Sequence, residues 1–86
     1  MNYIIYRHTS PSGKVYIGQT CRKPEHRWNS GKNYEECTLF FSAIKKYGWD
    51  NIKHEVLFTG LDQLNANIIE EDLIYYYKQQ GISYNL

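Results

Sequence analysis

The chain lacks the features that would assign it to the common classes of membrane or secreted protein. Its 86 residues contain no apolar run near the roughly 20 residues that cross a bilayer, and no signal-peptide pattern opens the sequence. Two cysteines, Cys21 and Cys37, have neither metal-ligand spacing nor the density of a disulfide framework. We therefore expect one domain, residues 1–86, with no membrane partner. Free thiols in a cytoplasmic protein, in a bacterial, phage or viral setting, are favoured over a Cys21–Cys37 bridge.

The chain also lacks the excess positive charge of many nucleic-acid-binding proteins, because its net charge is only +1. The charges are nevertheless divided unevenly. Residues 1–34 carry six Lys and Arg against Glu25 alone, a balance of +5, whereas residues 35–86 carry four Lys against eight acids, a balance of −4. A basic half could meet phosphates while an acidic half holds a metal or faces water. Ordinary solvated charges are the alternative.

Two short segments joined by a turn carry the strongest signal. Residues 3–6 (YIIY) and 14–20 (KVYIGQT) are typical of strands, and the turn formers of residues 9–13 lie between them. Strand residues alternate faces. A core made from Ile5, Val15 and Ile17 would therefore turn an aromatic and cationic set the other way: Tyr6, His8, Lys14, Tyr16 and Gly18. Two phenols and a cation beside a glycine that admits a close approach form a candidate phosphate site. Alternatively, tyrosines are simply good strand residues.

The rest of the chain predicts three helices and one more strand. Pro24 suits the first turn of a helix that ends near Ser30, before Gly31. Thr38 is a candidate N-cap for a helix that stops at Gly48 and buries Phe40, Ala43, Ile44 and Tyr47. Residues 52–59 resemble a strand, with alternating Ile52, His54, Val56 and Phe58.

A long last helix follows, capped by Asp62 and closed by Gly81, with Leu64, Ile68 and Tyr75 among its expected buried positions. The element order is β-β-α-α-β-α. This order predicts a small α/β sandwich in which a three-stranded antiparallel sheet is flanked by helices.

The hairpin resembles the signature of the GIY-YIG nuclease family. Tyr16-Ile17-Gly18 matches the second half-motif, and Ile4-Ile5-Tyr6 matches the first except that Ile4 stands where the family has Gly. Three further segments resemble the family's pattern in order along the chain: Glu25-His26-Arg27-Trp28, with Arg27 as the match, Ile69-Glu70-Glu71-Asp72-Leu73-Ile74, with Glu70, and Tyr84-Asn85-Leu86, with Asn85. The resemblance covers nearly the whole chain and implies the same element order.

The resemblance implies a metal-dependent DNA endonuclease that hydrolyses phosphodiester bonds. Glu70 would hold one Mg²⁺ or Mn²⁺ ion, and Glu71 is the alternative register. Arg27 would grip a phosphate with two parallel donors. Tyr6 is favoured as the base, with its pKa lowered by Lys14 and Arg27. Tyr16 would position water or the phosphate, and Asn85 would hold the hairpin or a water. The expected DNA-contacting residues are Lys14, Gly18, Arg22, Lys32 and Tyr34.

A domain this small offers little surface for reading sequence, because specific protein–DNA interfaces bury roughly 1,000–2,500 Å² of protein. We therefore expect low intrinsic specificity, or specificity supplied by a homodimer, by a separate partner, or by other domains from which this one was excised. A second hypothesis is a nucleic-acid-binding module that keeps the fold and has lost cleavage, which the Ile4 departure leaves open. A protein-interaction domain is the third, and the five matched residues argue against it.

Overall fold

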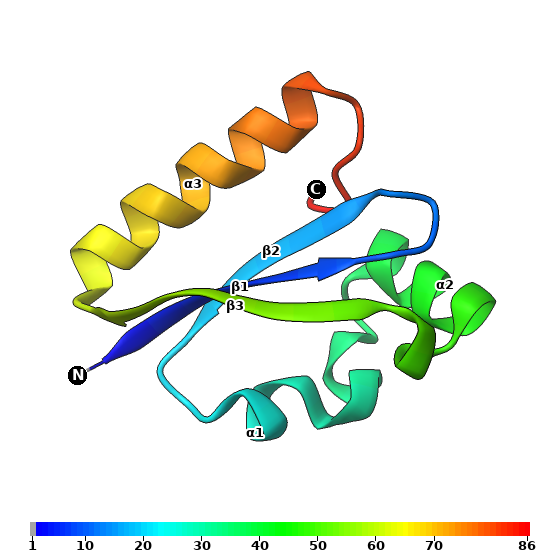
Figure 1. Ribbon diagram of the computed structural model, residues 1–86, viewed down its shortest axis with the longest axis horizontal. Helices are drawn as coiled ribbons and strands as arrows, with labels where there is room; N and C mark the ends of the chain where they lie inside the picture. The colour runs from blue at the N-terminus through cyan, green and yellow to red at the C-terminus, as the bar shows by residue number, and fades with distance from the viewer. Residues whose placement is uncertain (1) are drawn as a thin grey trace.

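The computed structural model describes residues 2–86, and its elements follow the predicted β-β-α-α-β-α order (Figure 1). They are β1 (Tyr3–Thr9), β2 (Val15–Thr20), α1 (Pro24–Trp28), the 3₁₀ segment η1 (Asn29–Tyr34), α2 (Thr38–Tyr47), the 3₁₀ segment η2 (Trp49–Asn51), β3 (Lys53–Leu61) and α3 (Gln63–Gln79). The predicted α/β fold with one three-stranded sheet is therefore confirmed.

The sheet is antiparallel throughout, with strand order β2-β1-β3 and β1 in the centre. Tyr6 lies opposite Gly18 on one side and Val56 on the other. His8 lies opposite Tyr16 and His54. β1 is the central strand, and its side chains lie at the centre of two separate cores, one on each face of the sheet.

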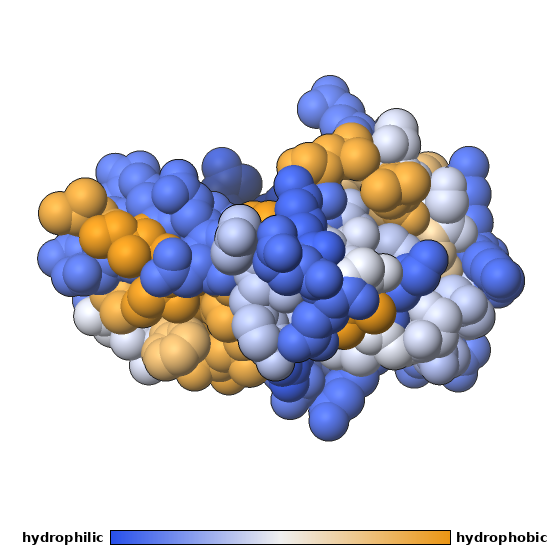
Figure 2. All heavy atoms as spheres, turned by 90° about the horizontal axis from the view of Figure 1, so that it is seen from above, coloured by the Kyte–Doolittle hydropathy of each residue, from blue (hydrophilic) through white to orange (hydrophobic). Residues whose placement is uncertain are grey.

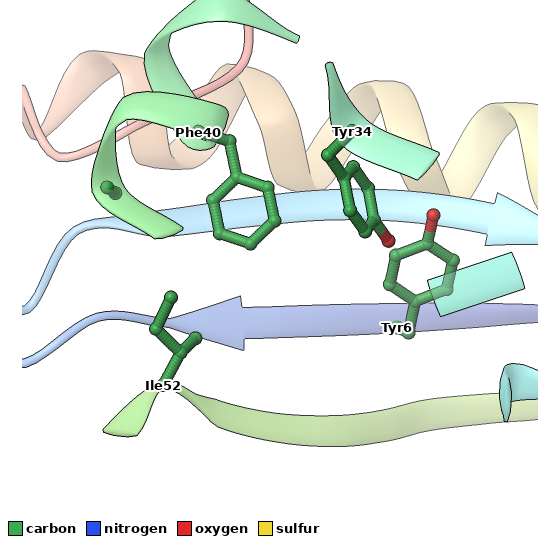
Figure 3. Packing of buried hydrophobic residues seen from close by; sticks show 5 residues of the cluster. Tyr6, Tyr34, Phe40 and Ile52 are labelled. Carbon is green, nitrogen blue, oxygen red and sulfur yellow. The ribbon is translucent and has the colours of Figure 1, made fainter. Parts of the chain in front are cut away.

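Helices cover both faces of the sheet (Figure 1). The long α3 lies over one face, and α1 with α2 lies on the other. Ile5, Ile17 and Ala66 form the core beneath α3. The second core contains Tyr6, Tyr34, Phe40, Ala43 and Ile52 (Figure 3). The expectation that the tyrosine face turns away from the core is therefore wrong. Residues 24–47 return across that face and bury it.

The first helix is shorter than the predicted 24–30. It ends at Trp28, and the chain continues as the 3₁₀ segment η1. Asn29 and Ser30 adopt positive φ angles of 44° and 52°, and Gly31 follows at 88°. The left-handed backbone at Asn29 stops α1 and turns the chain back toward the sheet. That turn delivers Tyr34 into the core.

The second helix ends as predicted but begins differently. Gly48, at φ 86°, closes α2 and its amide donates to the Ile44 carbonyl over 2.8 Å. The N-cap is Cys37 rather than Thr38, which is the first helical residue, and no side-chain cap bond forms there. Phe40 and Ala43 are buried as expected.

Strand β3 begins and ends later than the predicted 52–59. Ile52 is buried just before the strand. Val56 and Phe58 are 42% and 45% exposed, although alternation predicted a buried face. This strand is a sheet edge, and the irregular pairing with β1 between Ile5 and Tyr6 interrupts the simple period of two.

Asp62 caps α3 as predicted, accepting a hydrogen bond from the Asn65 amide over 2.7 Å. The predicted buried face of this helix is wrong. Leu64, Ile68 and Tyr75 are exposed, and Figure 2, seen from the α3 side, shows hydrophobic residues at this surface among hydrophilic ones. Apolar residues occur all around α3, so periodicity alone could not select its face. The sheet is contacted instead by Ala66, Ile69, Leu73 and Tyr77.

Two smaller predictions concern the cysteines and the membrane. Cys21 and Cys37 are both free, and Cys21 is exposed. Within residues 2–86, no helix combines the length and the apolar composition that crossing a bilayer would require.

Candidate active site

Arg27 is placed by the short helix α1 and the turn that follows it. Its guanidinium carbon lies 4.6 Å from the centre of the Tyr34 ring, a cation–π arrangement. The side-chain amide of Asn33 donates to the main-chain carbonyls of His26 and Arg27, at 3.1 Å each. These bonds fix the end of α1, so the half-buried Arg27 side chain is held over the tyrosine cluster.

Tyr6 lies beneath Arg27 and reaches across the sheet from β1 to β2. Only 1% of Tyr6 is exposed. A Cβ atom at Gly18 would overlap the hydroxyl oxygen and ring carbons of Tyr6. Gly18 was predicted to admit a DNA phosphate, and this is corrected: the missing side chain makes room for the phenol of Tyr6. The hydroxyl of Tyr6 therefore lies over the backbone of the edge strand β2.

The Tyr6 phenol is not the depressed acid that the sequence predicted. Burial raises the pKa of Tyr6 above its usual value of 10, and the charge of Glu70 raises it further. Hydrogen bonding with Tyr34 and the charge of Arg27 lower it, but by less than burial raises it. Lys14 is not among the groups that act on Tyr6. In this state Tyr6 is a neutral phenol, so the expectation that cations make it a tyrosinate base is wrong.

Tyr16 and Tyr34 are neutral phenols for the same reason, since burial raises the pKa of each well above its usual range. Tyr16 is half-buried, and its hydroxyl lies 3.5 Å from Cys37 Sγ. Tyr34 was predicted to contact DNA from a loop, and this is corrected because its side chain is fully buried. Burial is the largest single influence on the pKa of Arg27, and it lowers that pKa. The neighbouring phenols and Cys37 together raise it by more, so the pKa of Arg27 lies above its usual value. The guanidinium stays charged.

Glu70, the residue that the predicted register selects, lies on the sheet-facing side of α3. Its Oε1 accepts a hydrogen bond from the Gln19 side chain of β2 over 3.0 Å, and the same Gln19 amide donates to Asn67 over 2.7 Å. Glu70 is half-buried, whereas the neighbouring Glu71 and Asp72 are exposed. Glu70 is also the acid whose charge acts on Tyr6. The alternative register at Glu71 would point away from β2.

The donor set around Glu70 fits a hard divalent cation. The Gln19 side chain presents its amide nitrogen to Glu70 and Asn67, so the Glu70 carboxylate itself is the oxygen ligand offered here. Mg²⁺ sites often use one or two carboxylates with waters and phosphate oxygens. Within residues 2–86, no group of three or more His, Cys, Asp and Glu side chains could hold a metal ion. Waters and phosphate oxygens would therefore complete the coordination at Glu70.

Asn85 acts on the backbone of β2. Its Oδ1 accepts from the Ile17 amide and its Nδ2 donates to the Ile17 carbonyl, both at 2.9 Å. The side-chain amide thus pairs with the edge strand as a neighbouring strand would. Of the two functions predicted for Asn85, holding the hairpin is the one that the structure supports. It fixes the strand that carries Tyr16 and Gly18.

The predicted basic contacts are divided between two places. Arg22 and Lys32 are exposed on the segments before and after α1, on the same stretch of chain as Arg27. Lys14 lies at the other end of β2, in a hollow of about 350 Å³ that Lys46 also lines. Neither Tyr6 nor Arg27 lines that hollow. Lys14 therefore does not share the site of Tyr6, which corrects its predicted place on a common phosphate-binding face.

The residue that sequence reasoning undervalued is His8. It is fully buried at the centre of the aromatic core, with its ring stacked 5.1 Å from that of Phe40. Its Nε2 lies 2.8 Å from the Tyr34 hydroxyl, and its Nδ1 lies 2.8 Å from Nδ1 of His54. The available signal was parity: His8 shares a strand face with Tyr6, and His54 shares the apolar alternation of the third strand.

These residues form a site with an outer and an inner part. Arg27, Tyr16 and Glu70 are half-buried and can meet a phosphate, whereas Tyr6 and Tyr34 lie beneath them. A hollow of about 260 Å³ adjoins this region and is lined by Tyr16, Glu36, Cys37, Tyr84, Asn85 and Leu86. Comparison of the chain with protein-family models, with curated proteins and with solved structures found no match.

Proposed function

We propose that the chain is a divalent-metal-dependent DNA endonuclease domain of the GIY-YIG type. The observation that carries the proposal is convergence. Arg27 from α1, Tyr6 from β1 and Glu70 from α3 are far apart in the sequence. Arg27 nevertheless lies 4.6 Å from the centre of the Tyr34 ring, the Tyr6 hydroxyl reaches Gly18 of β2, and Glu70 accepts from Gln19, the next residue of that strand. A cation can stabilise the charge that develops on phosphorus-bound oxygens, and a carboxylate can hold a metal ion that assists phosphodiester hydrolysis.

Each residue has a role that follows from its position. Arg27 binds the nonbridging oxygens of the scissile phosphate with its two-pronged guanidinium. Glu70, with the Gln19 amide beside it, would hold Mg²⁺ or Mn²⁺, and the ion would supply stabilisation of charge on the phosphate and the leaving 3′ oxygen. Tyr16 positions the attacking water as a neutral hydrogen-bonding group. The Tyr6 hydroxyl, which lies over the Gly18 backbone, would be next to that water.

Contacts to the rest of the DNA come from exposed cations near α1. Arg22 and Lys32 flank the segment that carries Arg27, and they would meet phosphates on either side of the cleaved bond. Such contacts position the protein and carry no sequence information. We therefore propose low intrinsic specificity, supplemented by a second copy or a separate DNA-reading partner. An intracellular location follows from this proposal.

A second candidate function is DNA binding without cleavage. The burial of Tyr6, 1% exposed, and its raised pKa both favour it, because they remove the tyrosinate base. The exposed cations would still bind phosphates.

One experiment separates the two functions. Supercoiled plasmid is incubated with the protein in Mg²⁺, in Mn²⁺ and in EDTA, and the products are resolved on agarose. The nuclease proposal predicts nicked and then linear plasmid with either metal and intact plasmid in EDTA. A retarded but uncut plasmid under all conditions would establish the binding module instead.

A further inference from the structure

A continuous chain of hydrogen bonds runs from the phenol cluster to the far edge of the sheet. The Tyr34 hydroxyl lies 2.8 Å from His8 Nε2. His8 Nδ1 lies 2.8 Å from His54 Nδ1, and His54 Nε2 lies 2.9 Å from the Trp49 carbonyl oxygen. His8 is fully buried, and His54 is half-buried in β3 against the Trp49 ring, 3.9 Å between centroids.

The direction of these hydrogen bonds is fixed by the last of them. A carbonyl oxygen only accepts, so His54 Nε2 carries the proton. A neutral imidazole has one N–H, which makes His54 Nδ1 an acceptor. His8 Nδ1 must then donate to it, and His8 Nε2 must accept. The Tyr34 hydroxyl therefore donates to His8.

This direction extends to Tyr6. Because the single proton of Tyr34 is directed to His8, the Tyr34 oxygen is left as an acceptor on the side of Tyr6. The hydroxyls of Tyr6 and Tyr34 point toward one another (Figure 3). Burial raises the pKa of both phenols, and the hydrogen bonding between them lowers the pKa of Tyr6 and raises that of Tyr34. When Tyr6 donates to Tyr34, its own oxygen is an acceptor beside the Gly18 backbone, which is where the relay proposed below places the attacking water.

The histidines are the basic members of this chain. Burial, then the charges of His54 and Arg27, lower the pKa of His8 to about 3. Burial lowers the pKa of His54, while the Trp49 carbonyl and the charge of Asp50 raise it. Both imidazoles are therefore neutral at pH 7, in the form that accepts a proton, whereas the phenols are too weakly acidic to supply a phenolate. Of the two, His54 has the groups that favour its cation.

We propose that Tyr6, Tyr34, His8 and His54 form a proton relay that carries the proton of the attacking water to His54. This proposal rests on the proposed nuclease function. The water gives one proton to the Tyr6 oxygen as its own oxygen bonds to phosphorus. Tyr6 passes its proton to Tyr34, Tyr34 to His8 Nε2, and His8 Nδ1 to His54 Nδ1. The 3′ oxygen leaves with the P–O electron pair and takes a proton from solvent, to which His54 returns one. His8 and His54 never touch the substrate.

Two variants break the relay without removing the outer site. His54→Asn offers Oδ1 to accept from His8 but cannot take up a proton. Tyr34→Phe keeps the ring beneath Arg27 and removes the link between Tyr6 and His8. We expect each to lower single-turnover cleavage at pH 7 by about 10²-fold or more, the scale of a lost proton acceptor. DNA affinity should be unchanged. His26→Asn, at an exposed histidine, is the control.

A merely structural role for these residues predicts different data. Links in one relay are not additive, so the double variant should be no slower than Tyr34→Phe alone. The wild-type rate should rise through a pKa below 6.5 and stay level from pH 7 to 9, whereas the His54→Asn rate should keep rising with pH. Additive losses that follow the melting temperatures would overturn the relay, and so would a wild-type rate that rises tenfold per pH unit to pH 9.

The relay also has a test that needs no activity. Nitrogen-15 NMR of the imidazoles should show His8 protonated at Nδ1 and His54 protonated at Nε2. The opposite tautomer at His8 would overturn the relay. If the wild-type protein leaves plasmid intact in Mg²⁺, the nuclease function fails while these tautomers can still be as stated. If it cleaves and His54→Asn cleaves equally well, the relay alone fails.

Discussion

Arg27 has a different role in a nuclease from the one it would have on an inert protein surface. It is half-buried over the Tyr34 ring at 4.6 Å and stays charged among three phenols. A surface arginine in an ion pair would contribute about 0–1 kcal/mol to stability. An arginine that grips a phosphate in the transition state contributes far more to the rate.

Arg27→Lys separates these roles, because lysine keeps the charge and loses the two-pronged fork. We expect nearly normal DNA binding and a fall in cleavage of roughly 10²-fold or more, the scale of one lost transition-state donor. Single-turnover cleavage at saturating protein measures this, with Lys32→Arg as a control for charge on the same segment. A near wild-type rate would remove Arg27 from the catalytic residues.

Gly18 tests the packing of Tyr6 directly. Its Cβ position is occupied by the Tyr6 ring, so Gly18→Ala should force the ring to shift and destabilise the fold by about 1–3 kcal/mol, as overpacked cores do. Urea unfolding measures the change. Adding Tyr6→Phe removes the overlapping hydroxyl, so the double variant should lose less than the sum of the two singles. Additive losses would mean that the two residues do not meet.

At the scale of elements, the edge strand β2 is closed by the segment that follows α3. The Val15 amide donates to the Ile82 carbonyl at 2.8 Å, the Tyr84 amide donates to the Val15 carbonyl at 2.7 Å, and Asn85 pairs with Ile17. This pairing satisfies backbone groups that an edge strand would otherwise present to water or to another chain. It also fixes the position of Tyr16 relative to α3.

Asn85→Ala should therefore act through the strand. It leaves both main-chain groups of Ile17 without their side-chain partner, which costs about 1–3 kcal/mol where such groups are buried. Cleavage should fall together with the protection of the Ile17 amide from hydrogen exchange. Asn51→Ala, which removes a single exposed bond to the Tyr47 carbonyl, is the control and should change neither. A loss of rate with full protection at Ile17 would place Asn85 on the water or the substrate instead.

The elements that the sequence predicted best are those with local signals. Asp62 begins a helix through its side-chain cap and Gly48 ends one through its positive φ angle, and both predictions are confirmed. The failures depend on the tertiary structure. Leu64 and Ile68 are apolar residues on an exposed face of α3, because the sheet selected the face with the small residue Ala66. Helix propensity and periodicity carry no information about which of two apolar faces a sheet will contact.

The site shows the same division. Short motifs selected Glu70 and Arg27, and both lie half-buried beside the sheet rather than on the solvent-facing surface. The burial of Tyr6 and Tyr34 could not be predicted, because it depends on η1 returning across the sheet. The rise in the phenol pKa values follows chiefly from that burial, and at Tyr6 the charge of Glu70 adds to it.

For the whole molecule, the histidine network predicts how stability depends on pH. His8 has a pKa of about 3 when folded and about 6.5 when unfolded, so the unfolded state binds more protons between these values. Stability from the neutral imidazole is fully present above pH 6.5 and is lost as pH falls toward 3, by at most about 1.4 kcal/mol per pH unit for one proton. His54, with a lowered pKa, acts in the same direction.

Urea unfolding between pH 7 and pH 4 measures this slope. We expect His8→Gln to be less stable at pH 7 but to have a shallower slope than the wild type. Glu55→Gln is the comparison variant. The pKa of Glu55 is lowered, chiefly by its hydrogen bond to Arg7, so the stability that the Glu55 carboxylate contributes is also lost in acid. An unchanged slope in His8→Gln would show that His8 is not buried as a neutral group.

The central claim, that Glu70 holds a metal that cleaves DNA, is tested most directly by a matched pair of neighbouring substitutions. Glu70→Gln keeps the size and an oxygen acceptor for Gln19 but removes the charge that binds a cation, and Glu71→Gln makes the same change one residue away on the exposed face of α3. Both proteins are assayed on supercoiled plasmid in Mg²⁺, with melting temperatures compared. The account predicts that Glu70→Gln is folded and leaves the plasmid intact, whereas Glu71→Gln nicks it at the wild-type rate. Normal nicking by Glu70→Gln would contradict the account.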